Sequence, residues 1–361
     1  MVYRKALKSV KHEKRHTKLD ITNTLVLLVL LTLSCIMVYS ASMIGNKYGI
    51  FTSSVPVETT YFLKRQAIWA VLSFVTFIFI SVAIPFEVFR DKNILQYGFF
   101  AMVILLVIPF ASSSINGARS WIRLGALSFQ PSTLAQLFII IYMAFILETR
   151  KDKLRKVCTS NELINIFWIP LFLIAIIFFQ NDTGMMLITL SVVGIMTLCS
   201  NMHFKNIKRL LTLAVMAIVI VVALLFVKSA FSSGSSYRTN RIKVFLNPFS
   251  EDLSAAADQV INSYIAFGNG GLFGRGLGNS IQKLGYLPEA HTDFILAIIA
   301  EELGLVGVLF VIGLLTALIC RVIIAGTKSR NTFAAMYCIG FASLLVVQSV
   351  VNIGGITEDI L

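Results

Sequence analysis

Charged residues are scarce in this sequence. Only 14% of its 361 residues are Asp, Glu, Lys or Arg, whereas 57% are hydrophobic. A soluble domain carries about 25% charged residues, and its core cannot bury so large an apolar surface. The shortage of charge therefore excludes an ordinary soluble protein. It predicts that lipid is the solvent for most of the chain.

The sequence also lacks the motifs of several soluble classes. It contains no Walker A motif and no GxGxxG, so a soluble nucleotide site has no support. A net charge of +13 is compatible with nucleic-acid binding, but the basic residues sit between apolar runs and no nucleic-acid motif accompanies them. The five cysteines form no CxxC and no zinc spacing, so we interpret them as packing residues.

Long apolar runs dominate what is present. A spanning helix needs about 20 mostly apolar residues, and the first run is too long for the core of a signal peptide. We expect an all-α, polytopic membrane protein, with a basic tail over 1–20 and a single membrane domain over 21–361. The nine predicted spans are 21–42, 66–85, 95–111, 132–148, 163–179, 184–200, 208–228, 293–320 and 332–354.

The distribution of Lys and Arg sets the predicted orientation. The tail and the connections near residues 90, 150–156, 205–209 and 321–330 are short and basic. The positive-inside rule places such segments in the cytoplasm, and the N-terminus with them. The tail is then best interpreted as a solvated segment attracted to anionic lipid. A docking site for a cytoplasmic division partner remains the alternative.

Three of the segments that then face outward look unlike ordinary connectors: 112–131, 180–184 and the long loop 229–292. Guanidinium groups bind phosphate oxygens in pairs, so basic residues here suit a lipid-linked pyrophosphate. The alternative is contact with lipid headgroups and no catalysis. The basic residues in question are Arg119, Arg123, Arg238, Arg241, Lys243, Arg275 and Lys283.

The second half of the long loop is rich in glycine. Six glycines lie between 268 and 278. Glycine permits tight turns and a close approach of the backbone to a ligand. The alternative that we leave open is a compact loop packed on the helices.

Asp293 is the most informative acid, because it lies where the long loop enters the next span. Partial desolvation there favours a general base, with His291 and Glu289 nearby. An N-terminal cap role for Asp293 and Thr292 is the alternative. Further acids lie in or beside apolar runs, where ionisable groups are costly and are usually functional or paired. They are Asp182, Glu301 and Glu302.

Particular motifs resemble those of the SEDS family, which includes FtsW, RodA and SpoVE. The resemblance runs from MVYSAS at 37–42 to NIGG at 352–355 and is strongest over GNGGLFGRGLGNSIQKLGYLPEAHTDFILAIIAEELG. Supporting motifs are NGARSWI, which contains Trp121, then RTNRIKVFLNPF, and QxxxNIGG. The GNSIQKLGYLPEAHTDF segment is most similar to the division and sporulation branch.

The resemblance implies a peptidoglycan glycosyltransferase that polymerises lipid II on the outer membrane face with a class B penicillin-binding protein. Asp293 matches the family's essential aspartate, which would deprotonate the attacking sugar hydroxyl. Arg119, Arg238 and Arg241 would stabilise the departing pyrophosphate. The implied substrate site also takes in Trp121, Arg123, Lys243, Arg275, Lys283, Glu289 and His291. A divalent cation, Mg²⁺ or Mn²⁺, is compatible with such a site, although the sequence shows no ligand set. The implied location is the bacterial cell membrane at the division septum, among division-site membrane proteins.

The sequence departs from the family pattern around Asp182. Thr133 and Gln136 stand where the family has an acid and a lysine. That lysine would neutralise Asp182, so we group Asp182, Gln136 and Glu301 as polar pairing residues. We predict that Asp182 is either partly protonated or paired with another cation. The chain also ends before the tenth span that the family has. These departures keep open the alternative of a weakly active paralogue that scaffolds a transpeptidase. A lipid II flippase, an older proposal for the family, is a further alternative.

Overall fold

The computed structural model describes residues 19–52, 55–111, 119–124, 127–213, 216 and 254–357. Within these residues, seven helices are long and apolar enough to cross a membrane, and Thr183–Leu198 is a shorter apolar helix. They match eight of the nine predicted spans. The remaining prediction, 208–228, falls mostly outside the described residues.

The spanning helices begin and end close to the predicted positions. They are α2 (Ile21–Lys47), α3 (Tyr61–Ala83), α4 (Lys92–Val107) with the 3-10 turn η2 (Ile108–Ala111), α5 (Pro131–Thr149), α7 (Ser160–Phe179), α8 (Thr183–Leu198), α12 (Ile295–Lys328) and α13 (Thr332–Thr357). The connecting elements are η1 (Phe86–Arg90), β1 (Ile122–Leu124), β2 (Leu127–Phe129), α6 (Lys151–Leu154), α11 (Ser254–Gly270) and η4 (Gln282–Leu284). The antiparallel pair β1–β2 and the helix α11 both lie in segments that we had predicted only as loops.

Local sequence explains where several helices start. The side chains of Asp20, Asp91 and Asp182 accept hydrogen bonds from the first-turn amides of α2, α4 and α8. Thr159 and Glu162 form a reciprocal capping box at the start of α7, and Pro131 occupies the first turn of α5. The capping side chains accept from first-turn amides that have no partner within the helix, and proline has no amide hydrogen to satisfy.

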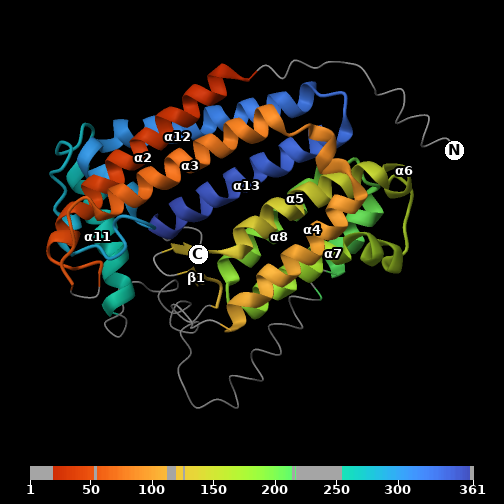
Figure 1. Cartoon of the computed structure of the whole chain (residues 1–361), viewed down its shortest axis with the longest axis horizontal. Helices are drawn as coiled ribbons and strands as arrows, with labels where there is room; N and C mark the ends of the chain where they lie inside the picture. Colours follow the sequence, from red (N-terminus) through yellow and green to blue (C-terminus); the bar gives the residue numbers. More distant parts are fainter. Residues whose placement is uncertain are drawn as a thin grey trace, which may run out of the picture.

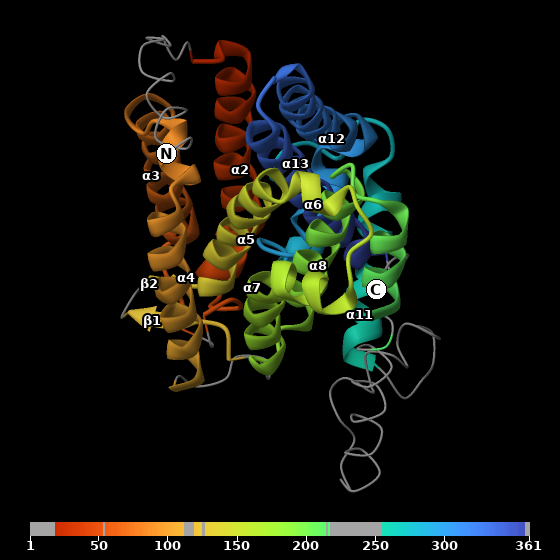
Figure 2. The ribbon, with the colours of Figure 1, turned by 90° about the vertical axis from the view of Figure 1, so that its right-hand side faces the viewer.

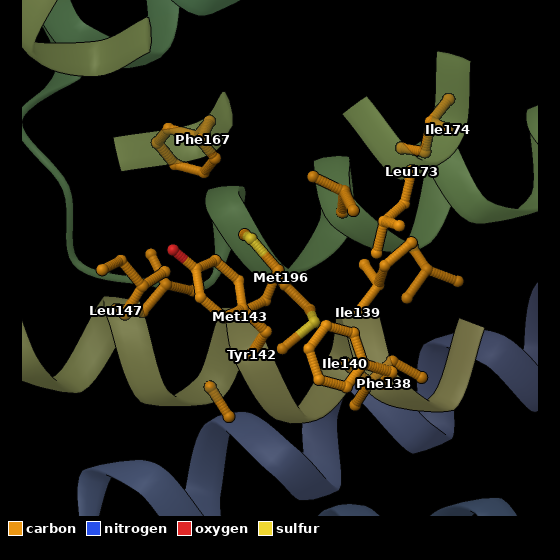
Figure 3. Packing of buried hydrophobic residues seen from close by; sticks show 14 of the residues in the cluster. Phe138, Ile139, Ile140, Tyr142, Met143, Leu147, Phe167, Leu173, Ile174 and Met196 are labelled. Carbon is orange, nitrogen blue, oxygen red and sulfur yellow. The ribbon is translucent and has the colours of Figure 1, made fainter. Parts of the chain in front are cut away.

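The helices pack as two adjoining groups (Figure 1). Helices α4, α5, α7, α8 and α13 enclose one hydrophobic cluster, and α2, α11 and α12 enclose a second. Figure 3 shows the centre of the first cluster, where Met143 and Ile140 of α5 meet Met196 of α8. Helix α12 contacts both α2 and α13 and so joins the groups. Figure 2 shows α3 at the edge of the bundle, and α3 contains no buried residue. Its outward Val, Ile and Phe side chains fit a lipid surface rather than water.

The predicted cytoplasmic connections gather at one end of the molecule. Arg321 at the end of α12 makes a double hydrogen bond with Asp20 at the start of α2. Arg90, before α4, pairs in the same way with Glu148 at the end of α5. Helix α11 lies at the opposite end from α6 (Figure 1). The arrangement agrees with a bundle whose short basic loops share one face.

Helix α12 is broken at Gly304, near its N-terminal end. Gly304 has φ 70° and ψ −170°, a conformation that is essentially restricted to glycine. The glycine-rich segment 268–278, called the glycine loop below, packs against the break. The amides of Arg275 and Gly276 donate to the carbonyl oxygens of Glu301 and Glu302 at 2.9 and 3.0 Å. The amides of Leu305 and Val306 donate in turn to Gly271 and Leu272 at 3.0 and 3.2 Å.

Three glycines make this contact sterically feasible. A Cβ at Gly274 would lie 2.1 Å from the Glu302 carbonyl oxygen, and one at Gly270 would lie 1.9 Å from that of Ala300. A Cβ at Gly304 would lie 2.4 Å from the Gly274 nitrogen. These glycines therefore bring the loop against α12. This result favours the packed-loop alternative over close approach to a ligand at these positions.

We predict that Gly304→Ala destabilises the protein, because alanine strains the backbone at this φ and ψ by about 1–3 kcal/mol and also collides with the loop. The measurement is the thermal unfolding midpoint in detergent. Gly313→Ala in the same helix is the matched control, because Gly313 has open space around its Cα and should tolerate a methyl group. Equal midpoints for Gly304→Ala and Gly313→Ala would contradict the broken-helix geometry.

Candidate active site at the outer end of α12

The segment after the glycine loop carries a fully buried ion pair. The Lys283 ammonium lies 2.7 Å from Glu302 Oε1, and both side chains have no exposed surface. Ser40 of α2 donates to the same carboxylate at 2.7 Å, and its hydroxyl lies 3.3 Å from the ammonium. We expected Lys283 among the outer phosphate-binding residues. The structure places its charge inside the protein, against Glu302.

Glu301 is held by a separate set of donors. The amides of Ile281 and Gln282 donate to its carboxylate at 3.1 and 3.2 Å, and the Ser280 hydroxyl also donates to it. Asn269 of α11 lies at 3.4 Å. A buried carboxylate is stable only with such partners. We grouped Glu301 with Asp182 and Gln136, and the structure instead places Glu301 with the loop that precedes Asp293.

Asp293 follows a tight turn and is exposed just before α12 begins. The turn rests on Glu289, whose φ is 55° and whose carbonyl accepts from the amides of Thr292 and Phe294. Leu287 and Ala290 are fully buried in the second hydrophobic cluster. The N-cap residue of α12 is Phe294, not Asp293. Asp293 is therefore exposed on a turn that the buried side chains of Leu287 and Ala290 hold against the helices.

His291 lies beside Asp293 and between two aromatic rings. Its imidazole centroid is 4.5 Å from the ring of Phe51 and 4.3 Å from that of Phe62. Burial lowers the pKa of His291 below its usual value, and the charges of Glu289 and Asp293 oppose this shift. The neutral imidazole is thus the form that the fold favours.

A second polar group lies in the first helix cluster. Gln130 donates to Asp182 at 2.8 Å, and Asp182 also caps α8. Gln136, almost fully buried, donates to Thr189 at 3.0 Å and lies 3.4 Å from the amide of Gln348. Asp182 thus accepts from a neutral side-chain amide and from the backbone, whereas Gln136 belongs to a neutral network that joins α5, α8 and α13.

The predicted basic residues are distributed unevenly. Arg119 is exposed, and its amide donates to the Gln180 carbonyl, so Arg119 lies beside the turn before α8. Trp121 is partly exposed next to it, and Arg275 is exposed on the glycine loop. Arg123 lies in β1, where only the backbone is described. Arg238, Arg241 and Lys243 lie outside the described residues. In the described part of the chain, no group of three or more His, Cys, Asp or Glu side chains could hold a metal ion.

Residue-by-residue reading missed the partners that complete these networks. They are Ser40, Asn269, Ser280, Gln130, Thr189 and Gln348. Only one signal pointed to them: intramembrane acids such as Glu302 require partners. Which serine or amide supplies the bond depends on the packing of elements far apart in the sequence.

Comparisons with known proteins identify the class. The family model for the FtsW, RodA and SpoVE cell cycle proteins matches residues 21–358. The chain therefore belongs to this family of membrane proteins. Its fold is similar to the crystal structure of the Thermus thermophilus rod shape determining protein RodA, with a TM-score of 0.61 and 21% identity over 93% of this chain and 84% of that one. It is also similar to a chain in the structure titled "Structural coordination of polymerization and crosslinking by a peptidoglycan synthase complex", with a TM-score of 0.63, 21% identity, and 94% and 87% of the two chains covered.

Curated relatives place the chain on the FtsW side of the family. A protein of Geobacter sp. (strain M18) is 33% identical over 92% of this chain and 86% of its own. A protein of Haemophilus influenzae is 36% identical over 90% of this chain and 78% of its own. Both are named probable peptidoglycan glycosyltransferase FtsW. By these relatives the chain is an FtsW-like enzyme of the peptidoglycan glycosyltransferase class.

The His291 environment predicts a pH-dependent stability. Its pKa is lower in the folded state, so the unfolded chain binds the proton more readily. The stabilisation is complete above the unfolded value near 6.5 and is lost as pH falls through the lower folded value. We expect the wild-type unfolding midpoint to fall more steeply from pH 8 to pH 5 than that of His291→Phe, which keeps the aromatic packing. Parallel curves would contradict the assignment.

Proposed function

We propose that this chain polymerises lipid II into glycan strands on the outer face of the bacterial cell membrane, with Asp293 as the general base. The observation that carries the role of Asp293 is its placement: an exposed carboxylate on an anchored turn, at the outer end of a spanning helix. In the proposed reaction Asp293 takes the proton of the acceptor sugar 4-hydroxyl. The freed oxygen attacks the anomeric carbon of the donor with inversion, and undecaprenyl pyrophosphate leaves with the electron pair of the broken bond.

The leaving pyrophosphate needs positive charge. Arg119 supports this role, because it is exposed beside the turn before α8. We assign the same role to Arg238 and Arg241 from the family pattern. Trp121, Arg123, Lys243, Arg275, Glu289 and His291 remain proposed substrate contacts. Lys283 is better suited to holding the loop, because its charge is already neutralised. Mg²⁺ or Mn²⁺ at the pyrophosphate stays a prediction.

The cellular setting is also part of the proposal. We place the N-terminus in the cytoplasm, because the short basic loops gather at the end opposite α11. The structure of the similar chain is titled for a complex that coordinates polymerization and crosslinking. We therefore propose a class B penicillin-binding protein as partner, and work at the division septum with other division-site membrane proteins. A weakly active scaffold is the second candidate, because Gln136 brings no charge to the Asp182 region.

The direct test is strand synthesis from purified lipid II by the reconstituted protein with its partner transpeptidase. Asp293→Asn keeps the shape of the side chain but removes the base, so we expect the rate to fall by about 100-fold or more. Glu58→Gln is the matched control, since Glu58 is an exposed acid in the connection between α2 and α3 and is paired with Lys64. Full activity of Asp293→Asn would contradict the assignment. Absence of strands from wild type would favour the scaffold.

The departure at Gln136 generates a further prediction. Gln136→Lys brings a cation to the network beside α8, where it can neutralise Asp182, and we expect strand synthesis to rise. Gln136→Met has a similar volume and no charge, so it should give no increase. An unchanged rate for Gln136→Lys would contradict the view that a missing charge limits this chain.

A further inference from the structure

Lys283 is among the largest fully buried side chains of the described residues, and it forms a charge pair that stability alone does not explain. A buried ion pair often contributes no more to stability than apolar residues of the same volume. Removing one partner, however, leaves an uncompensated charge in the interior. Lys283, Glu302 and Ser40 satisfy one another at 2.7–3.3 Å. Such a group specifies one arrangement of the elements that carry it.

The three residues come from three separate elements. Ser40 lies in α2, Lys283 in the short turn η4, and Glu302 just before the break in α12. The hydrogen bonds therefore tie the loop to two helices at once. An outward slip of the loop would break both contacts of the Lys283 ammonium, with Glu302 and with Ser40, and would leave Glu302 without its cation. The group fixes the register of the loop on α12.

Asp293 lies midway along the segment that this pair closes. The chain runs from Lys283 through the turn to Asp293 and then along the first turns of α12 to Glu302. Two bonds stiffen the first half: Leu287 N donates to Gln282 O at 3.0 Å, and Asn262 donates to Tyr286 O at 2.8 Å. The helical turns of α12 stiffen the second half. The position of Asp293 thus depends on the Lys283–Glu302 contact.

We propose that Lys283 and Glu302 are a positioning pair that holds the Asp293 turn in place for polymerisation. The inference rests on the proposed function, in which Asp293 is the base. The pair touches neither substrate nor reacting atoms. It acts through the turn, so its loss should impair the chemical step more than substrate binding.

The kinetic test uses Lys283→Met, Glu302→Gln and the double variant, each normalised to folded protein. A misplacement of the base near 1 Å costs about 100-fold in rate. We therefore expect each single variant to lower kcat by about 100-fold with KM for lipid II little changed. The double variant leaves no unpaired charge, so its fold-loss in kcat should be clearly smaller than the product of the two single-variant losses. Ser40→Ala is a milder variant that should shift kcat in the same direction if a single charge variant does not fold.

Amide hydrogen exchange gives a readout that does not require activity. Deuterium uptake over 286–294 should be faster in each single variant and should return toward wild type in the double variant. Lys64→Met is the matched control: it breaks an ion pair with Glu58 at 2.6 Å that is 61% exposed on both sides, and surface pairs contribute little. It should leave uptake and kcat unchanged.

The outcomes separate this inference from the proposed function. If wild type makes no strands, the proposed function fails, and faster uptake over 286–294 in the single variants still supports the positioning pair. Unchanged uptake in Lys283→Met overturns the pair whatever the activity. If the protein is active, single variants with wild-type kcat overturn the positioning pair as well. So does a double variant whose fold-loss in kcat equals the product of the two single-variant losses.

Discussion

The break in α12 depends on one exchange of backbone hydrogen bonds, and the end of the bundle that carries α11 is organised around it. A membrane helix cannot leave amides and carbonyls unpaired in lipid, so irregular backbone is tolerated only where protein supplies the partners. Here the loop around Gly274 supplies them on both sides of Gly304. Because the two backbones touch, side chains larger than hydrogen are excluded at the contact. The described part of the long loop, from α11 onward, is therefore an extension of the helix bundle.

This docking explains why charge is tolerated deep in an apolar protein. Once the loop lies against α12, its next residues meet Glu301 and Glu302, which have no exposed surface. Backbone amides and Ser280 satisfy the first carboxylate, while Lys283 and Ser40 satisfy the second. The polar network of the other helix group is built differently, from the neutral side chains of Gln136, Thr189 and Gln348. Charge is thus concentrated beneath the turn that carries Asp293, the residue proposed for chemistry.

Sequence predicted most of the fold, because hydropathy and length decide which segments span lipid. Eight predicted spans correspond to apolar helices. The sequence also places Asp293 beside a span, but it predicts partial desolvation there, whereas the structure leaves Asp293 exposed. The sequence did not predict which polar side chains pair. It assigns Lys283 to phosphate, whereas Lys283 is buried against Glu302, and Asp182 accepts a hydrogen bond from Gln130. These two contacts join residues 19 and 52 positions apart, and no local pattern encodes such separations. The glycines showed that backbones approach closely, but not that the partner is α12.

The measurement that tests the account most directly is residue-resolved amide exchange at Arg275 and Gly276 in the wild-type protein in lipid nanodiscs. Both residues lie on an exposed part of the loop, yet their amides donate to the Glu301 and Glu302 carbonyls. The account predicts exchange slowed by about 100-fold or more relative to an unstructured peptide. In an unbroken α12, those carbonyls would instead accept from Leu305 and Val306. Exchange of both loop amides at the unstructured rate would contradict the docking on which the position of Asp293 depends.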